Sequence, residues 1–426
     1  MKTLTSLVIV LVIFSQAIFA QKNCGTTEYL EKVRLEYPAT SFKNSLLYSA
    51  PQSSNTGSSS SELSSETVIT IPVVVHVLFN SSVNVTDEQI KSQIDALNRN
   101  FNKENEDFSK VPAVFAGVAG AANIRFELAK VDPDGRATNG ITRTKSAREL
   151  WTNDDKVKNP AYGGVAPWDA NSYLNIWVCN LVPGLLGYAS APGSPADKDG
   201  VVIKYNIFGT SNSGNYNMGR TAVHEVGHWL NLKHLWGDKE CGSDEVDDTP
   251  QQRTYNQGTP SFPKMGMGCS AANPYGEMFM NFMDFTNDAS MMMFTKGQVK
   301  RMRTLFSTGG VRASIRYSKA LGQPWNNSPV ASGTSNTGTV TKPAPLVVAA
   351  TVKLYPNPAV NNITISSEQG ISGKSFAVYA ADGKIVTSGT VSSNVFNLNI
   401  SSFHRGIYFI KLGEAADKQV LRFVKQ

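Results

Sequence analysis

One stretch of eleven residues, HEVGHWLNLKH from His224 to His234, constrains the fold of this chain more than any other feature. His224 and His228 are four residues apart, so on a helix their imidazoles share one face, with the carboxylate of Glu225 beside them. His234 reaches the same point only if the helix ends before it and the chain turns back. Asn231 lies where that turn is needed, and asparagine tolerates the left-handed conformation better than any residue except glycine. The stretch therefore predicts a helix, a sharp turn and three converging imidazoles.

Three converging imidazoles predict a zinc site of the catalytic kind. Tetrahedral zinc with three histidine ligands has a fourth position open for the water that it activates. Glu225 is not needed as a ligand and is placed to act as the general base. The alternative is a surface helix with incidental histidines, but three of the five histidines in 426 residues fall in this stretch. We therefore predict zinc ligation by His224, His228 and His234.

The same residues carry a family resemblance. HEVGHWLNLKH resembles the HExxHxxGxxH zinc signature of the metzincin metallopeptidases, and NFMDF resembles their Met-turn, with Met283 beneath the metal. IPVVVHVLFN, LNIWVCN and CGSDEVDDTPQQ are similar to segments of the pappalysin family, and the resemblance covers residues 67–310. It implies an α+β metzincin-like catalytic domain, with a mixed sheet and an active-site helix. It also implies a secreted, zymogenic zinc endopeptidase that acts on proteins.

Two positions depart from the family pattern. Asn231 replaces a glycine, which leaves ligation intact. Phe285 stands where the family usually has a tyrosine whose hydroxyl stabilises the tetrahedral intermediate, and loss of one such donor costs on the order of a hundredfold in rate. Phe285 therefore favours an alternative, a secreted zinc-containing adhesin or binding protein with weak or no proteolytic activity. Glu225 favours the enzyme, because a structural zinc site has no use for a base.

An acidic loop follows the zinc motif. Asp244, Glu245, Asp247 and Asp248, with Thr249, provide the oxygen density that calcium needs. Similar family members bind calcium there, so the resemblance implies a calcium site at Asp247, Asp248 and Thr249. The alternative is a solvated acidic loop.

Four cysteines suit an exported protein with one or two disulfides. Cys241 and Cys269 flank a Gly- and Pro-rich loop and are the predicted pair, which matches a bridge of the resembled family. Cys179 lies in a strand-like run, which favours a buried free thiol. Cys24 lies in NCGT, a setting similar to the latency cysteine of pappalysin-like prosegments, and is predicted to bind the zinc until the segment is removed. The alternative is a disulfide between Cys24 and Cys179.

The segment NFMDFTNDASMMM contains Asp284 and Asp288, which we predict to line a specificity pocket. The segment after a Met-turn commonly borders the residue that follows the scissile bond, and an acidic group there favours Arg or Lys. Alternatively, both carboxylates are surface or helix-capping groups and the methionines form an apolar pocket. No Lys or Arg occurs between Lys43 and Lys91. A basic-specific enzyme that matures itself would therefore cut at or before Lys43.

Residues 67–325, the predicted catalytic domain, alternate between strand and helix patterns. TVITIPVVVHVLFN, NIRFELAKV, LNIWVC and VVIKYNIF predict strands, and TDEQIKSQIDALNRNF predicts a helix with Thr86 and Gln89 as a capping box. The pattern is mixed α and β. His76 and His404 lie in strand-like runs and are interpreted as structural.

The N-terminal region predicts export. Residues 1–20 are interpreted as a signal peptide rather than a membrane anchor, because the apolar run is shorter than the roughly 20 residues that span a bilayer. Residues 21–66 are a predicted propeptide that includes a Ser-rich connector. No later segment is long and apolar enough to span a membrane. The net charge of +6, without a dense basic run, excludes nucleic-acid binding.

Residues 326–350 form a predicted linker, and residues 351–426 consist of short alternating runs that predict a small all-β sandwich. KLYPNPA and GIYFIKL resemble the C-terminal sorting domain of cargo of the type IX secretion system of Gram-negative bacteria. The resemblance implies that machinery as a partner and a secreted or cell-surface location. The alternative is a generic β-sandwich binding module.

Overall fold

The computed structural model describes residues 23–36, 63–211, 214–323, 352–357, 359–367, 371–380, 384–413 and 419–426. The chain divides into two compact units, Met1–Ser332 and Gly333–Gln426. The predicted signal peptide, the Ser-rich connector before Leu63 and the predicted linker lie outside the described residues.

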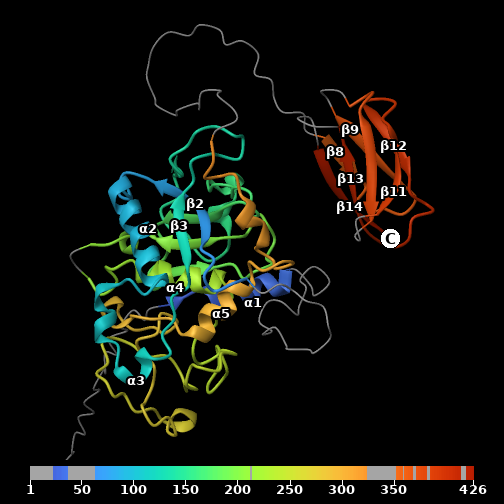
Figure 1. Ribbon diagram of the computed structural model, residues 1–426. Helices are drawn as coiled ribbons and strands as arrows, with labels where there is room; N and C mark the ends of the chain where they lie inside the picture. Colours follow the sequence, from blue (N-terminus) through green and yellow to red (C-terminus); the bar gives the residue numbers. More distant parts are fainter. Residues whose placement is uncertain are drawn as a thin grey trace, which may run out of the picture. The chain divides into compact units, whose positions relative to one another are not determined.

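The first unit is built on a seven-stranded mixed sheet with the order β1-β6-β7-β5-β2-β3, in which β4 also pairs with β2 (Figure 1). The strands are β1 (Asn23–Cys24), β2 (Ile69–Phe79), β3 (Ile124–Leu128), β4 (Ile141–Lys145), β5 (Leu174–Cys179), β6 (Leu185–Ala189) and β7 (Val201–Lys204). The strands pair in parallel, and β6 with β7 is the antiparallel exception among the described pairs. The four strands predicted from sequence correspond to β2, β3, β5 and β7.

The helices of this unit are α1 (Thr26–Glu36), α2 (Asp87–Phe101), α3 (Ala113–Ala116), α4 (Arg220–Trp229) and α5 (Lys296–Thr304). Short 3₁₀ turns cover Glu106–Lys110, Lys156–Lys158, Pro160–Tyr162, Tyr205–Ile207, Gly268–Ser270, Asp288–Ser290 and Ala313–Tyr317. The Thr86 hydroxyl caps α2 by accepting from the Gln89 amide at 3.1 Å. The Gln89 side chain does not return to Thr86 as the capping box predicts; it donates to the carbonyl of Phe208 at 2.6 Å and ties α2 to the segment after β7.

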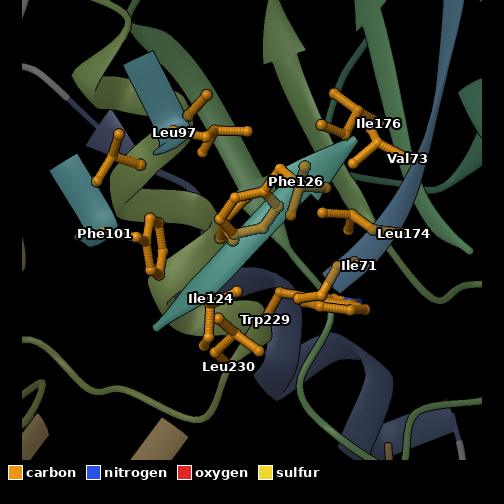
Figure 2. Packing of buried hydrophobic residues seen from close by; sticks show 14 of the residues in the cluster. Ile71, Val73, Leu97, Phe101, Ile124, Phe126, Leu174, Ile176, Trp229 and Leu230 are labelled. Atoms are coloured by element: carbon orange, nitrogen blue, oxygen red, sulfur yellow. The ribbon is translucent and has the colours of Figure 1, made fainter. Parts of the chain in front are cut away.

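One hydrophobic core joins the sheet to α2, α4 and α5 (Figure 2). Its members include Ile71, Val73, Leu97, Phe101, Ile124, Phe126, Leu174, Ile176, Trp229 and Leu230. Burying each such large side chain contributes about 1.5–3 kcal/mol. Because Val223 and Val226 of α4 belong to the same cluster, the core fixes the position of the helix that carries the zinc motif.

The C-terminal end of α4 has a further anchor. The Trp229 indole donates to the Asp199 carboxylate at 2.6 Å, and the Arg312 guanidinium lies 3.5 Å from the centre of the indole ring. Arg312 also pairs with Asp199 at 3.2 Å. These contacts hold the helix end from which the chain must turn.

The second unit contains two antiparallel sheets with the orders β12-β9-β8 and β11-β10-β13-β14. The strands are β8 (Val352–Tyr355), β9 (Asn362–Ser367), β10 (Ser375–Ala380), β11 (Ile385–Thr390), β12 (Val395–Asn399), β13 (Gly406–Leu412) and β14 (Gln419–Lys425). Ile363 and Ile365 of β9 share one core with Val378 of β10 and Ile410 of β13. This unit is therefore the all-β sandwich that the sequence predicts.

Among the described helices of the whole chain, none is long and apolar enough to cross a membrane.

Candidate metal centre

The structure places the zinc motif on α4 and the turn that follows it. His224 and His228 lie on the helix and are 1% and 5% exposed. The helix ends at Trp229, and Asn231 adopts a φ of 75°, the left-handed conformation predicted for it. The Asn231 carbonyl accepts from Nε of Arg301 at 2.7 Å. The reversed chain then brings His234 to the other two imidazoles.

The Nε2 atoms of the three imidazoles form a compact triangle. The separations are 3.2 Å for His224 and His234, 3.1 Å for His224 and His228, and 3.0 Å for His228 and His234. Nitrogen ligands at zinc distances of 2.0–2.1 Å in a tetrahedron are about 3.3 Å apart. The triangle therefore has the dimensions of a zinc site.

The hydrogen bonds at the opposite ring atoms fix the tautomer of each imidazole. Nδ1 of His224, His228 and His234 contacts, respectively, the Phe282 carbonyl at 2.7 Å, the Leu232 carbonyl at 2.8 Å and the Asp238 carboxylate. These oxygens only accept, so each Nδ1 carries the hydrogen and each Nε2 presents a lone pair. Burial, followed by the neighbouring His234, lowers the pKa of His228 to about 3. Three imidazoles that turn Nε2 toward one point are arranged to bind a cation.

Asp238 is a site residue that the sequence analysis missed. Burial alone would raise the pKa of its carboxyl, but His234 and the hydrogen bonds from His234 and Thr27 outweigh burial and hold the pKa below its usual range. The resulting carboxylate orients the third imidazole, a common arrangement around metal-binding histidines. The sequence feature that could have identified Asp238 is its position four residues after His234.

Glu225 is fully buried on α4 beside β6. A Cβ at Gly187 of β6 would lie 2.9 Å from Cγ of Glu225, so glycine is needed there. Oε2 of Glu225 accepts from the Thr26 hydroxyl at 2.8 Å and from the Cys24 thiol at 3.6 Å.

Cys24 lies at the three imidazoles, as the sequence predicts for a latent form. Its sulfur and one nitrogen from each of His224, His228 and His234 all lie within 4.8 Å of one another. Burial and the Glu225 carboxylate raise the pKa of the Cys24 thiol, and a cation at the imidazoles would oppose both effects. Cys24 and Cys179 are both free, so the alternative disulfide between them is not formed.

Met283 packs against α4 at Gly227, and Phe285 borders the imidazoles. Met283 is fully buried, and a Cβ at Gly227 would lie 2.6 Å from its sulfur, so the glycine of HEVGH leaves room for it. The Phe285 ring centre lies 5.7 Å from that of His224 and 4.8 Å from that of His234. In addition, Trp236 stacks on His234 with the ring centres 4.4 Å apart; the sequence analysis did not identify this contact.

The structure does not place Asp284 and Asp288 on the wall of a pocket. Both are 0% exposed. Asp284 accepts from the Asn256 amide at 2.7 Å and from Nε2 of Gln252 at 2.9 Å, and burial raises its pKa despite these donors. Asp288 accepts from the amide of Arg220 at 3.2 Å, at the first residue of α4. Asp288 thus caps a helix, as the alternative interpretation allowed, and the assignment of these two carboxylates to specificity does not fit this geometry.

Two carboxylates of the acidic loop, those of Asp244 and Asp248, accept hydrogen bonds from other groups of the protein. Asp248 accepts from the Thr295 hydroxyl at 2.6 Å and from the Gly297 amide at 2.8 Å, which joins the loop to the start of α5. The Thr249 hydroxyl donates to Asp244 at 2.8 Å, and Asp247 is exposed. Within the described ranges, the group of His, Cys, Asp and Glu side chains that converges as metal ligands is that of Cys24 and the three histidines.

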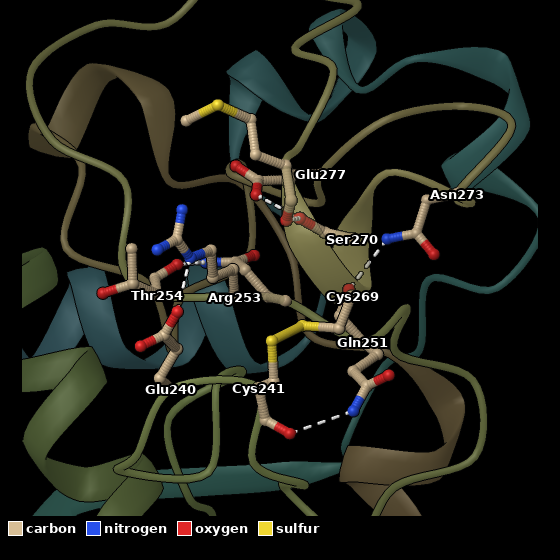
Figure 3. Close-up of a disulfide and its surroundings, with 11 residues drawn as sticks. Glu240, Cys241, Gln251, Arg253, Thr254, Cys269, Ser270, Asn273 and Glu277 are labelled. Carbon is tan, nitrogen blue, oxygen red and sulfur yellow. Dashed lines mark hydrogen bonds and ion pairs between the residues drawn. A yellow bond between two sulfur atoms is a disulfide. The ribbon is translucent and has the colours of Figure 1, made fainter.

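Cys241 and Cys269 form a disulfide (Figure 3). The Gln251 side chain donates to the Cys241 carbonyl at 3.0 Å, and Arg253 pairs with Glu240 at 2.7 Å. The long segment between the zinc motif and the Met283 turn is thereby held by a covalent link.

The two remaining histidines lie outside the imidazole cluster. His76, interpreted as structural, is buried and hydrogen-bonds to Thr142 and Asn175. His404 is exposed and lies just before β13 rather than in a strand.

A helix with two histidines, a turn that brings a third and a methionine packed against that helix define a metalloendopeptidase of the metzincin type. Comparison with known proteins supports this class. Residues 154–307 match the peptidase family described as Pregnancy-associated plasma protein-A, the pappalysins. The chain belongs to the pappalysin family.

Relatives in both sequence and structure support that assignment. An extracellular metalloprotease of Arthroderma otae is 30% identical over 244 residues, which cover 55% of this chain and 76% of the relative. Mature mirolysin of Tannerella forsythia, solved in complex with a cleaved peptide, is 50% identical to this chain with a TM-score of 0.58. The match covers 61% of this chain and 99% of the mirolysin chain. A promirolysin mutant of the same organism is 45% identical with a TM-score of 0.62 and covers 71% and 99%. The metzincin-like fold class is confirmed.

The chain is therefore a metalloendopeptidase, and the cofactor of its family is zinc. Residues 353–426 match a secretion-system C-terminal sorting domain. Together with the extracellular relatives, this domain places the protein outside the cell, secreted or at the cell surface, by the type IX route.

Proposed function

We propose that His224, His228 and His234 hold the catalytic zinc through Nε2 and that Glu225 is the general base of peptide-bond hydrolysis. One observation carries the proposal. Each imidazole directs its Nδ1 to an oxygen and turns its Nε2 inward, so the three Nε2 atoms lie 3.0–3.2 Å apart. A cation bound at this point would offset the repulsion between nitrogen lone pairs that face one another.

The side chains around the cluster then divide the work of hydrolysis. Zinc, when bound, supplies a Lewis acid that polarises the substrate carbonyl and lowers the pKa of water. Glu225 takes a proton from the attacking water and gives it to the leaving amine. Asp238 keeps the His234 ring in the tautomer that ligation needs. The Gly187 carbonyl and the Ala189 amide of β6 are bound here by Gly25 and Thr26. After removal of residues 21–66, they are suited to pair with an extended substrate.

We also propose that residues 21–66 keep the enzyme latent until they are removed, with Cys24 as a zinc ligand in the latent form. The position of Cys24 beside the imidazoles supports this role. A solved relative is named promirolysin, a name that denotes a precursor form. Residues 1–20 as a signal peptide, 67–325 as the catalytic domain and 326–350 as a linker complete the proposed organisation.

Two finer points remain predictions. A preference for Arg or Lys after the scissile bond would require an acidic group other than Asp284 or Asp288, because both are buried and hydrogen-bonded within the protein. The alternative, an apolar pocket formed by the methionines, would need side chains other than Met291 and Met293, which are buried in the hydrophobic cores. Calcium binding at Asp247, Asp248 and Thr249 is the second prediction.

The test is cleavage of a denatured protein by the matured enzyme. We expect hydrolysis that phenanthroline abolishes and added zinc restores. His228→Ala should lose both zinc and activity. His404→Ala, an exposed histidine of the second unit, is the matched control and should keep both. Zinc binding without any cleavage would instead favour the adhesin alternative.

A further inference from the structure

The prosegment contacts the proposed general base through a residue other than Cys24. Thr26, the first residue of α1, is 2% exposed. Its hydroxyl donates to Oε2 of Glu225 at 2.8 Å and accepts from the amide of Ala189 at 2.9 Å. Thr26 thus lies between β6 and the carboxylate of Glu225 and hydrogen-bonds to both.

The next residue makes a parallel contact. The Thr27 hydroxyl donates to Oδ1 of Asp238 at 2.7 Å, and the same oxygen accepts from Nδ1 of His234. Two consecutive threonines of the prosegment therefore bind two carboxylates, one at the base and one behind the third imidazole.

The start of α1 is held firmly enough to position these hydroxyls. The Gly25 amide donates to the carbonyl of Gly187 at 2.9 Å. One turn further along, Tyr29 is 1% exposed and donates to Asp155 at 2.8 Å. Lys32 donates to Asn153 at 2.9 Å. Because backbone and side-chain contacts fix α1 on both sides of the threonines, little further ordering is needed for their hydrogen bonds.

We propose that latency depends on a second contact, separate from Cys24, in which the Thr26 hydroxyl occupies Oε2 of Glu225 and holds the start of α1 over the proposed base. This inference rests on the proposed role of Glu225 as general base. A hydrogen bond to a buried carboxylate is among the stronger ones in proteins. Loss of Cys24 alone therefore leaves Thr26 bound to Oε2 of Glu225, and release of the prosegment requires both contacts to break.

The experiment measures opening of α1 by amide hydrogen exchange in the full-length chain, counting only molecules whose mass shows an intact chain. Thr26→Val, which removes the hydroxyl, is compared with wild type in two backgrounds, one with Glu225 and one with Glu225→Ala. Opening should rise by about tenfold or more with Glu225 present, as expected for loss of a hydrogen bond to a charged group. In the Glu225→Ala background the same change should raise opening less than about threefold, because the partner is already absent.

Two variants serve as controls. Thr26→Ser keeps the hydroxyl and should open like wild type. Thr27→Val breaks the contact with Asp238 and should change opening by the same factor in both backgrounds. The amides of β2 report whether the unit remains folded, and Thr26→Ala replaces Thr26→Val if they lose protection.

An equal effect of Thr26→Val in the two backgrounds would overturn the inference, because Thr26 would then act without Glu225. The readout is exchange rather than catalysis, so this result is independent of whether Glu225 is the base. As a functional check, Cys24→Ser should leave residual latency that Cys24→Ser with Thr26→Val removes. Full activity of Cys24→Ser alone would also count against a second contact.

Discussion

Asn231 is the point at which the backbone must reverse for the third imidazole to reach the other two. Its φ is 75°, and it is 5% exposed. The left-handed conformation costs an ordinary L-residue about 1–2 kcal/mol, and more when the side chain is β-branched. Oδ1 of Asn231 has no hydrogen-bond partner among the described residues, so truncation to glycine forfeits nothing at that atom.

Two substitutions at this position should therefore behave differently. Asn231→Gly should change the free energy of unfolding by no more than about 1 kcal/mol, because glycine adopts this conformation freely but gains entropy in the unfolded chain. Asn231→Val should lower the free energy of unfolding by about 2–3 kcal/mol, which combines left-handed strain with poor packing. The strain is relieved by moving His234, so the zinc affinity of Asn231→Val should fall at least about tenfold, as for other changes that misplace metal ligands.

Chemical denaturation and competition with a zinc chelator measure the two quantities. Lys103 supplies the matched control, since it also has a left-handed φ, 60°, but is exposed and packs its ammonium over Phe108. Lys103→Val should lose stability without loss of zinc affinity. The reasoning is refuted if Asn231→Val keeps wild-type zinc affinity, or if Asn231→Gly loses it.

Three further predictions concern catalysis, calcium and maturation. The Phe285 ring borders two of the imidazoles. Phe285→Tyr should therefore raise kcat more than it changes KM, because a hydroxyl there would act on the transition state. If steady-state kinetics show an unchanged or lower kcat, another group serves this role. Calcium at 100 times its Kd should raise the free energy of unfolding of the wild type by about 2.7 kcal/mol, as measured by chemical denaturation. Asp247→Asn should reduce this gain. An equal free energy of unfolding with and without calcium would show that the acidic loop is solvated and binds no calcium. If the enzyme prefers Arg or Lys and matures itself, N-terminal sequencing of the active form should give a first residue at Asn44 or earlier, next to a basic residue. A first residue within residues 53–67 would show that another protease matures the enzyme or that its pocket does not select basic residues.

The zinc motif could be predicted from sequence because its geometry is local. Helical spacing places His224 and His228 on one face, and the conformational tolerance of Asn231 allows the reversal that His234 needs. The strands and α2 were predictable for a similar reason, since alternation and helical spacing of apolar residues report which face is buried. The Thr86 cap follows the same local logic.

Contacts that join distant segments could not be predicted in this way. Thr26 lies 199 residues before its partner Glu225, and nothing in the sequence near either residue indicates the pairing. The Gln89 side chain was assigned a local partner but bonds to Phe208, which tertiary packing brings to it. Asp284 and Asp288 were predicted to line a specificity pocket, but spacing alone does not tell whether a carboxylate faces a pocket or the protein interior.

Glu225→Ala tests the central claim most directly when zinc content and peptide hydrolysis are measured on the same preparation of matured protein. Three histidines suffice to hold the metal if Glu225 is the base, so the variant should contain about one zinc per chain and hydrolyse no peptide above the rate of the chelated wild type. Loss of the metal would show that Glu225 is a ligand, and retained hydrolysis at the wild-type rate would show that it is not the base; either result would contradict the assignment of the site.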